Sequence, residues 1–294
     1  MTDKQLRFAI FGNVYQAKKS ASIQKILACL SQRDAKVMIE KEFYNFITKE
    51  QLIDVGDAEV FEDSDFSADF VISMGGDGTF LKSAGHVGPK NIPIVGVNMG
   101  RLGFLADISP SDIESAITAI YDGDYDIESR GVLQIETSDG KFPECPFALN
   151  DISVLKRDNA SMISIKATIN GEYLTTYQAD GLVVTTPTGS TAYSLSNGGP
   201  ILLPSCGVFG ITPVAPHSMN IRPIVVPDDS VIELSVASRS HNFLIAVDGR
   251  SVKCEEGIGI TMRKAGYEIQ VVKQKGNSYF HTMRDKLMWG ADVR

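Results

Sequence analysis

Apolar residues in the first 125 positions form short runs that alternate with segments of helical spacing. Along each run nearly every position is apolar, which is typical of buried strands: residues 6–13 (LRFAIFGN), 35–40 (AKVMIE), 69–74 (DFVISM) and 92–97 (IPIVGV). Other apolar residues recur at intervals of three and four and so predict helices: Ile23, Ile26, Leu27 and Leu30, then Ile113, Ala116, Ile117 and Ile120. For the later helix we expect Ser109 as N-cap and Pro110 at the first helical position.

The pattern changes near residue 130, where alternating and β-branched runs replace helical spacing. These runs are broken by Asp-Gly, Asn-Gly and Pro-Asp turns, and cover residues 131–142, 148–158, 161–187 and 230–254. We therefore predict a Rossmann-like α/β domain with a parallel sheet (1–125), followed by an all-β sandwich (126–278). Helical spacing returns in the tail through Phe280, Met283 and Leu287, so we expect residues 279–294 to pack back on the first domain.

Composition narrows the classes of protein to consider. The chain has 294 residues, of which 22% are charged and 43% hydrophobic, and its net charge of −8 argues against a nucleic-acid-binding protein. The sequence shows neither a signal peptide nor an apolar run long enough to span a membrane. The four cysteines are scattered and form no metal-binding or disulfide pattern, so we expect a cytoplasmic protein without a structural metal.

A glycine-rich turn, GGDG, follows the third predicted strand and encloses a single acid, Asp77. The glycines Gly75, Gly76 and Gly78 let a ligand approach the main chain, and N–H groups at a helix start suit a phosphate. Asp77 could instead simply cap the helix. Lys82, one turn later, is either a phosphate ligand or a solvated helix lysine.

Two further loops favour a nucleotide site. The segment NMGRLGFL (98–105) follows the next strand, so it should lie at the same sheet edge as Asp77. Within it, Leu102 and Phe104 are either core residues or an apolar seat for a base. The segment 180–200 (DGLVVTTPTGSTAYSLSNGGP) is rich in hydroxyls, which bind phosphate or ribose without a permanent charge, although it could be an ordinary solvated loop.

These motifs together resemble those of the NAD kinase family. GGDGTFL, NMGRLGFL, ALND, the 180–200 segment and APHSMNIRPIVVP occur here in the family's order and spacing. GGDG alone is weak evidence for this family, because diacylglycerol kinases, sphingosine kinases and phosphofructokinases share a version of it. The segment TPTGSTAYS is far more specific to the NAD kinase family. The resemblance implies transfer of the γ-phosphoryl group of ATP to the 2′-hydroxyl of the adenosine ribose of NAD, with Asp77 as general base and a divalent metal such as Mg²⁺ accompanying ATP.

The resemblance also implies a set of substrate-binding residues. Asn150 and Asp151 match a pair that grips ribose hydroxyls or the nicotinamide end, although such a pair also makes simple turns. Arg250 is either a phosphate ligand or an exposed hairpin residue. The full expected set is Gly75, Gly76, Gly78, Lys82, Leu102, Phe104, Asn150, Asp151, Gln178, Asp180, Thr191, Ala192, Tyr193, Ser194, Leu195, Ser196 and Arg250. No metal ligand is assigned.

Two alternatives remain open from the sequence. A lipid kinase shares the GGDGT turn but should present an apolar entrance, whereas the hydroxyl-rich segment suits a nucleotide. A non-catalytic sensor of NAD or NADP would keep the same binding residues. For partners we expect small nucleotides, no nucleic acid and no membrane, and a homo-oligomer (dimer or tetramer).

Overall fold

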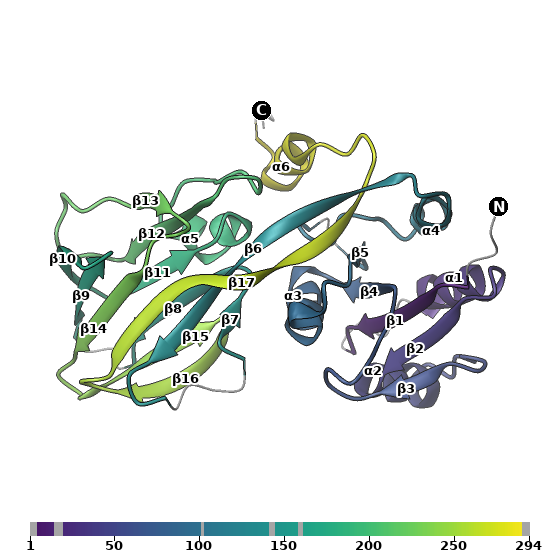
Figure 1. Ribbon diagram of the computed structural model, residues 1–294, viewed down its shortest axis with the longest axis horizontal. Helices are drawn as coiled ribbons and strands as arrows, with labels where there is room; N and C mark the ends of the chain where they lie inside the picture. The colour runs from purple at the N-terminus through teal and green to yellow at the C-terminus, as the bar shows by residue number, and fades with distance from the viewer. Residues whose placement is uncertain (1–4, 15–19, 101–102, 141–144, 158–160, 290–294) are drawn as a thin grey trace. The chain divides into compact units, whose positions relative to one another are not determined.

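The computed structural model describes residues 5–14, 20–100, 103–140, 145–157 and 161–289 (Figure 1). The chain divides into two compact units: unit 1 comprises Met1–Ser129 and Ile269–Arg294, and unit 2 comprises Arg130–Glu268. Residues 126–129 and 269–278, expected in the second domain, thus belong to unit 1. The boundaries fall inside two long strands that pair with each other, β6 (Tyr125–Thr137) and β17 (Gly259–Gln274).

Unit 1 is built around a parallel sheet with the strand order β5-β4-β1-β2-β3. Its strands are β1 (Arg7–Gly12), β2 (Lys36–Glu40), β3 (Glu59–Phe61), β4 (Phe70–Gly75) and β5 (Ile94–Asn98), and the end of β17 pairs in parallel with β5. Strands β4 and β5 are buried at every position, as their continuous apolar sequences predict. Gly75 lies opposite Asn98, so the loops that follow these two strands leave from the same edge.

Helices and helical turns complete unit 1. They are α1 (Ser20–Ser31), α2 (Lys41–Asn45), the π-helix η2 (Phe46–Glu50), α3 (Asp77–Val87), the 3-10 turn η3 (Gly88–Lys90), α4 (Ile113–Asp122) and α6 (Tyr279–Leu287). The apolar stripes of α1 and α4 join the buried core, as predicted. Helix α4 begins later than expected: its N-cap is Asp112, and the Ser109 hydroxyl donates to the Asp112 carboxylate at 2.7 Å.

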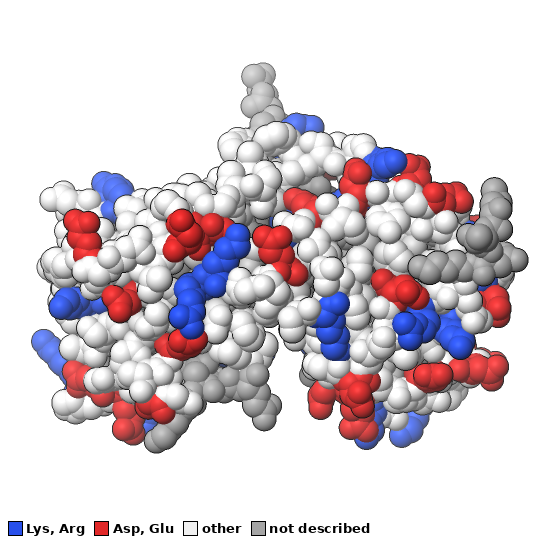
Figure 2. Space-filling view, viewed as in Figure 1, with Lys and Arg blue, Asp and Glu red and all other residues white. Residues whose placement is uncertain are grey.

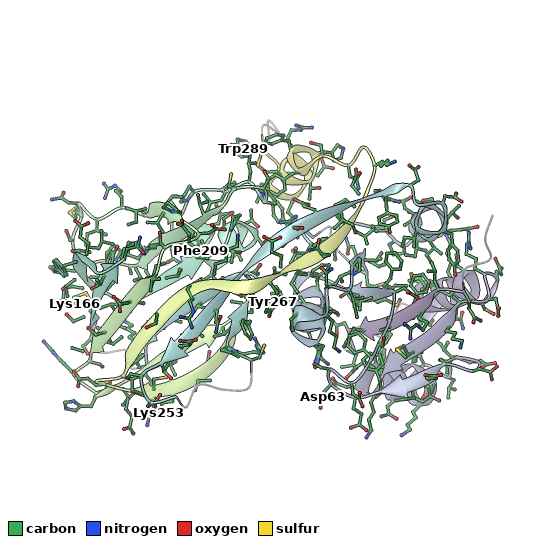
Figure 3. The ribbon with its side chains drawn as sticks, in the orientation of Figure 1. Asp63, Lys166, Phe209, Lys253, Tyr267 and Trp289 are labelled. Atoms are coloured by element: carbon green, nitrogen blue, oxygen red, sulfur yellow. The ribbon has the colours of Figure 1, made fainter. Side chains whose placement is uncertain are left out.

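Unit 2 is a sandwich of two sheets. One sheet is antiparallel throughout, with the order β13-β12-β11-β8-β15-β16, and the other contains β10-β9-β14-β17 together with β6 and β7. Its strands and turns are β7 (Phe147–Ala148), β8 (Asp151–Lys156), β9 (Ile163–Ile169), β10 (Glu172–Ala179), β11 (Gly181–Thr185), η4 (Thr188–Thr191), α5 (Tyr193–Ser196), β12 (Val208–Val214), β13 (Ile224–Pro227), β14 (Ile232–Ala237), β15 (Asn242–Val247) and β16 (Arg250–Glu255). Both sheets contribute to one core, in which Phe209 is 1% exposed (Figure 3).

The predicted architecture is therefore confirmed: an α/β unit, an antiparallel sandwich and a C-terminal helix that returns to the first unit. The ring of Tyr279 in α6 lies 6.0 Å from that of Phe104, centroid to centroid, and both residues belong to unit 1. Among the described residues, no helix has the length and apolar character needed to cross a membrane. On the face drawn in Figure 2, acidic and basic side chains are interspersed.

Candidate functional site

The first locus lies in unit 1, where Asp77 is the first residue of α3. Its carboxylate accepts three consecutive backbone N–H groups of the loop after β5: Oδ2 from Phe104 at 3.0 Å, and Oδ1 from Leu105 at 3.0 Å and Ala106 at 3.1 Å. Gly76 is the N-cap of the helix, so the interpretation of Asp77 as a simple cap is wrong. The acid instead joins the glycine-rich turn to the neighbouring loop.

Glycines in and beside this turn leave room for close contacts with the main chain. A Cβ on Gly103 would lie 2.0 Å from Asp77 Oδ1, so a larger residue there would have to displace the carboxylate or the loop. A Cβ on Gly76 or Gly78 would meet nothing within 4 Å, so the backbone beside Asp77 is open to an approaching group. The close approach explains Gly103, and the open backbone fits a ligand-binding turn.

Of the other residues expected at this locus, Lys82 is already ion-paired and Phe104 is packed against another ring. The Lys82 ammonium group forms ion pairs with Glu42 at 2.7 Å and Glu40 at 3.7 Å, so its charge is already compensated by unit 1 itself. Phe104 is 9% exposed and lies against Tyr279. Leu102 lies outside the described residues.

The second locus lies in unit 2, at the start of β8, and contains Asn150 and Asp151. Asp248 accepts the N–H groups of Leu149 (2.8 Å), Asn150 (2.8 Å) and Asp151 (3.1 Å). In return, the Asp248 N–H donates to the Asp151 carbonyl at 3.0 Å. Asp248 and Gly249 form the two-residue turn between β15 and β16, with φ angles of 47° and 80° that match a type I′ hairpin.

Burial raises the pKa of both acids at this locus, Asp151 and Asp248. Asp151 is only 7% exposed, and burial, followed by the nearby negative charge of Asp248, raises its pKa to about 7. Burial also raises the pKa of Asp248, although the three amide donors and the Arg250 guanidinium oppose that rise. Within the described part of the chain, no hydrogen bond reaches the Asp151 carboxyl, so its hydrogen-bonding capacity is available to a ligand.

The hydroxyl-rich segment packs directly on this locus. Thr186 donates its N–H to the Asn150 carbonyl at 2.9 Å and its hydroxyl to the Leu149 carbonyl at 2.5 Å. A Cβ on Gly189 would lie 2.1 Å from the Asn150 carbonyl oxygen, so glycine allows the 3-10 turn to touch the backbone there. The backbone at Leu149 and Asn150 is thus part of a packed junction with the hydroxyl-rich segment.

The expected binding residues from 191 to 196 differ in exposure. Tyr193 is 38% exposed. Ser194 is fully buried, and its hydroxyl lies 2.9 Å from that of Thr212, so it holds the segment to β12. The remaining residues are partly or fully exposed: Thr191, Ala192, Leu195 and Ser196.

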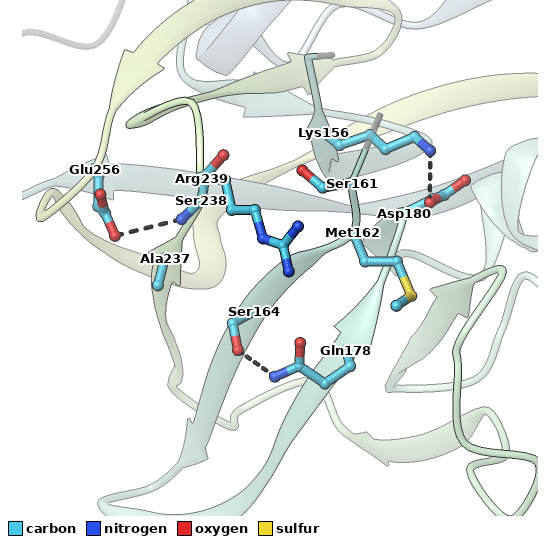
Figure 4. Close-up of a pocket in the computed structure, with 10 residues that line it drawn as sticks. All are labelled: Lys156, Ser161, Met162, Ser164, Gln178, Asp180, Ala237, Ser238, Arg239 and Glu256. Carbon is cyan, nitrogen blue, oxygen red and sulfur yellow. Dashed lines mark hydrogen bonds and ion pairs between the residues drawn. The ribbon is translucent and has the colours of Figure 1, made fainter. Parts of the chain in front are cut away.

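Of three further expected residues in unit 2, Gln178 and Asp180 lie away from Asp151, and Arg250 lies beside the Asp248 turn. Asp180 forms an ion pair with Lys156 at 2.7 Å, and the Gln178 amide donates to the Ser164 hydroxyl. Both border an open cavity of about 630 Å³ (Figure 4), whose lining includes Lys156, Ser164, Gln178, Asp180, Arg239 and Glu256. Arg250 is exposed and donates to the Val247 and Phe147 carbonyls at 3.3 and 3.4 Å.

Sequence reasoning did not identify Asp248. The Asp-Gly pair between two alternating runs indicated a turn, but no local pattern shows that its carboxylate binds backbone far earlier in the chain, at sequence separations of 97 to 99 residues. The sequence placed the 98–105 loop at the same sheet edge as Asp77, but it did not show the close approach of Gly103 to the carboxylate.

Comparisons with known proteins agree on one family. The family model of the ATP-NAD kinase N-terminal domain matches residues 9–125, and that of the C-terminal domain matches residues 149–274. The chain is 53% identical to an NAD kinase of Bacteroides fragilis over 289 residues, which cover 98% of this chain and 100% of that one. It is 43% identical to an NAD kinase of Porphyromonas gingivalis over 288 residues, covering 98% and 99%.

Two solved structures resemble the fold. A yeast NADH kinase complexed with NADH matches with a TM-score of 0.88 at 22% identity, covering 100% of this chain and 90% of that one. An NAD kinase from Archaeoglobus fulgidus in complex with ATP matches with a TM-score of 0.70 at 26% identity, covering 95% and 99%.

Proposed function

Because the chain belongs to the NAD kinase family, we propose that it transfers the γ-phosphoryl group of ATP to the 2′-hydroxyl of the adenosine ribose of NAD, giving NADP. The observation that carries this proposal is the Asp77 carboxylate, held by three amide groups beside open glycine backbone. Such an arrangement fixes an acceptor oxygen next to main chain that a phosphate can approach.

Asp77 is the proposed base. A carboxylate offers about four acceptor positions, and three amide hydrogens use two on Oδ1 and one on Oδ2. The remaining position on Oδ2 accepts the ribose hydroxyl proton. Because the transition state for phosphoryl transfer is loose, the main task of Asp77 is to orient that hydroxyl, and the amides keep the carboxylate in place.

The residues of unit 2 bind the dinucleotide in this proposal. Asn150 and the ionised Asp151 bind ribose hydroxyls or the nicotinamide end, and Asp180 meets the nicotinamide amide or ribose. Thr191, Ala192, Tyr193 and Ser196 contact adenosine. Ser194, buried against Thr212, supports this segment from behind.

A divalent metal would accompany ATP. Among the described residues, no three His, Cys, Asp or Glu side chains cluster as a metal site. Mg²⁺ in kinases is held largely by the substrate phosphates, with few protein ligands, so the chain needs no dedicated cage. When bound, the metal would neutralise charge on the phosphates. We place the enzyme in the cytoplasm as a homo-oligomer.

The proposal is tested by incubating the protein with ATP, Mg²⁺ and either NAD or diacylglycerol, and measuring NADP and phosphatidic acid. We expect NADP only. Asp77→Ala should reduce kcat by about 10²–10⁴-fold. Asp112→Ala, which removes an acid from the N-cap of α4, should leave the rate unchanged. Phosphatidic acid formation would show a lipid kinase, and nucleotide binding without turnover would show a sensor.

A further inference from the structure

We propose that Asp248 is a positioning residue for the dinucleotide: its carboxylate fixes the backbone of Leu149, Asn150 and Asp151 and thereby aims the two polar side chains at the substrate. This inference rests on the proposed function, because it gives the Asn150-Asp151 pair its task.

The geometry is specific to a carboxylate. Oδ1 accepts from Asn150 and Asp151, and Oδ2 accepts from Leu149, so both oxygens are needed as acceptors. An asparagine would offer one oxygen and turn an N–H donor group toward backbone donors. The three bonds hold the backbone between the end of β7 and the start of β8. The Asp248 N–H also donates to the Asp151 carbonyl. From the turn between β15 and β16, Asp248 therefore holds the backbone that connects β7 to β8.

The same contacts bring two acids, Asp151 and Asp248, together in a poorly solvated part of unit 2. The negative charge of Asp248 contributes to the raised pKa of Asp151, after the larger effect of burial. Two other groups interact with Asp248: the Arg250 guanidinium on β16 lowers its pKa, and the charge of Asp248 helps to raise the pKa of Tyr267 on β17 (Figure 3). Asp248 thus also influences the pH at which Asp151 becomes an ionised acceptor.

Asp248→Asn separates these effects from loss of the turn. The chain already uses Asn170-Gly171 as a two-residue turn between β9 and β10, with φ angles of 51° and 81°, so asparagine suits this conformation. The matched control is Asp228→Asn, which removes a carboxylate of unit 2 that is paired with Lys264 at 2.7 Å.

The experiment measures kcat/KM for NAD, and NAD binding without ATP, between pH 5.5 and 9. In the wild type we expect kcat/KM to rise with pH through about 7 as Asp151 ionises. Asp248→Asn should lower kcat/KM by about 10²-fold, the effect of a small misplacement, and should move the midpoint to lower pH because it removes the neighbouring charge. Asp228→Asn should change neither quantity.

Three results would overturn the inference: an Asp248→Asn enzyme with wild-type kcat/KM, an unchanged midpoint in that variant, or equal losses in both variants. If Asp248→Asn does not fold, Asp151→Asn decides, because the pH-dependent limb should disappear and its persistence would refute the role of the pair. Failure of the proposed function is distinct, since the wild type would then form no NADP.

Discussion

Replacing Asp151 by asparagine should stabilise the protein, and the gain should depend on pH. Burial and the charge of Asp248 raise the pKa of this carboxyl from 3.8 to about 7. The unfolded chain therefore releases the proton near pH 4, whereas the folded chain keeps it until about pH 7. Unfolding between these values releases a proton, so the free energy of unfolding contributed by Asp151 falls as pH rises from about 4 to about 7.

The size of the effect follows from the same shift. Each tenfold change in proton affinity corresponds to about 1.4 kcal/mol, so a pKa raised by about three costs about 4 kcal/mol once the carboxyl is ionised. An asparagine side chain at this position would carry no charge and would avoid that cost. We expect Asp151→Asn to equal the wild type in stability near pH 4 and to exceed it by up to about 4 kcal/mol at pH 8.

Urea unfolding at pH 4.5 and pH 8 measures this difference. Asp57→Asn, on an exposed loop of unit 1, is the control, and its effect should stay within about 0.5 kcal/mol at both values. A stability difference for Asp151→Asn that is the same at both pH values would refute the reasoning, because the buried charge would then carry no cost. Activity should fall in the same variant, since stability and substrate binding place opposite demands on this acid.

Three other substitutions test separate contacts. Gly103→Ala should lower kcat by at least about 10-fold, because its methyl group would push the loop off Asp77; NADP formation measures this. Gly189→Ala should raise KM for NAD, because its Cβ would collide with the Asn150 carbonyl, whereas a normal KM would mean that the turn yields freely. Lys273→Met should lower the free energy of unfolding by about 3–5 kcal/mol, because the nearly buried Asp107 carboxylate would lose the ammonium group that lies 2.6 Å away. Thermal unfolding measures this loss.

Much of the fold could be predicted, because local patterns reflected burial. Strands β4 and β5 are apolar at positions facing both sides, and the stripes of α1 and α4 enter the core as spaced. The Asn170-Gly171 turn adopts positive φ angles, as the Asn-Gly signal predicts. The segment α2–η2 (41–50) gave no comparable signal, because Phe43, Phe46 and Ile47 are buried without a long helical repeat.

The candidate site was less visible in the sequence. Glycine loops pointed to Asp77, but not to the bonds it makes with residues 27 to 29 positions later. Asp248 looked like an ordinary turn acid, because only the pairing of β15 with β8 brings it to Asn150. Long-range contacts of this kind depend on strand register, which local propensity does not encode.

The division of unit 1 between the two ends of the chain has a consequence for synthesis. A ribosome releases Met1–Ser129 first, yet the strand segment that flanks β5 begins only at Ile269. The sandwich, one continuous stretch, can fold before its predecessor has received that last strand. Until then the nascent α/β portion lacks the β17 segment that pairs with β5, so the sandwich can be complete before the unit that begins to emerge first.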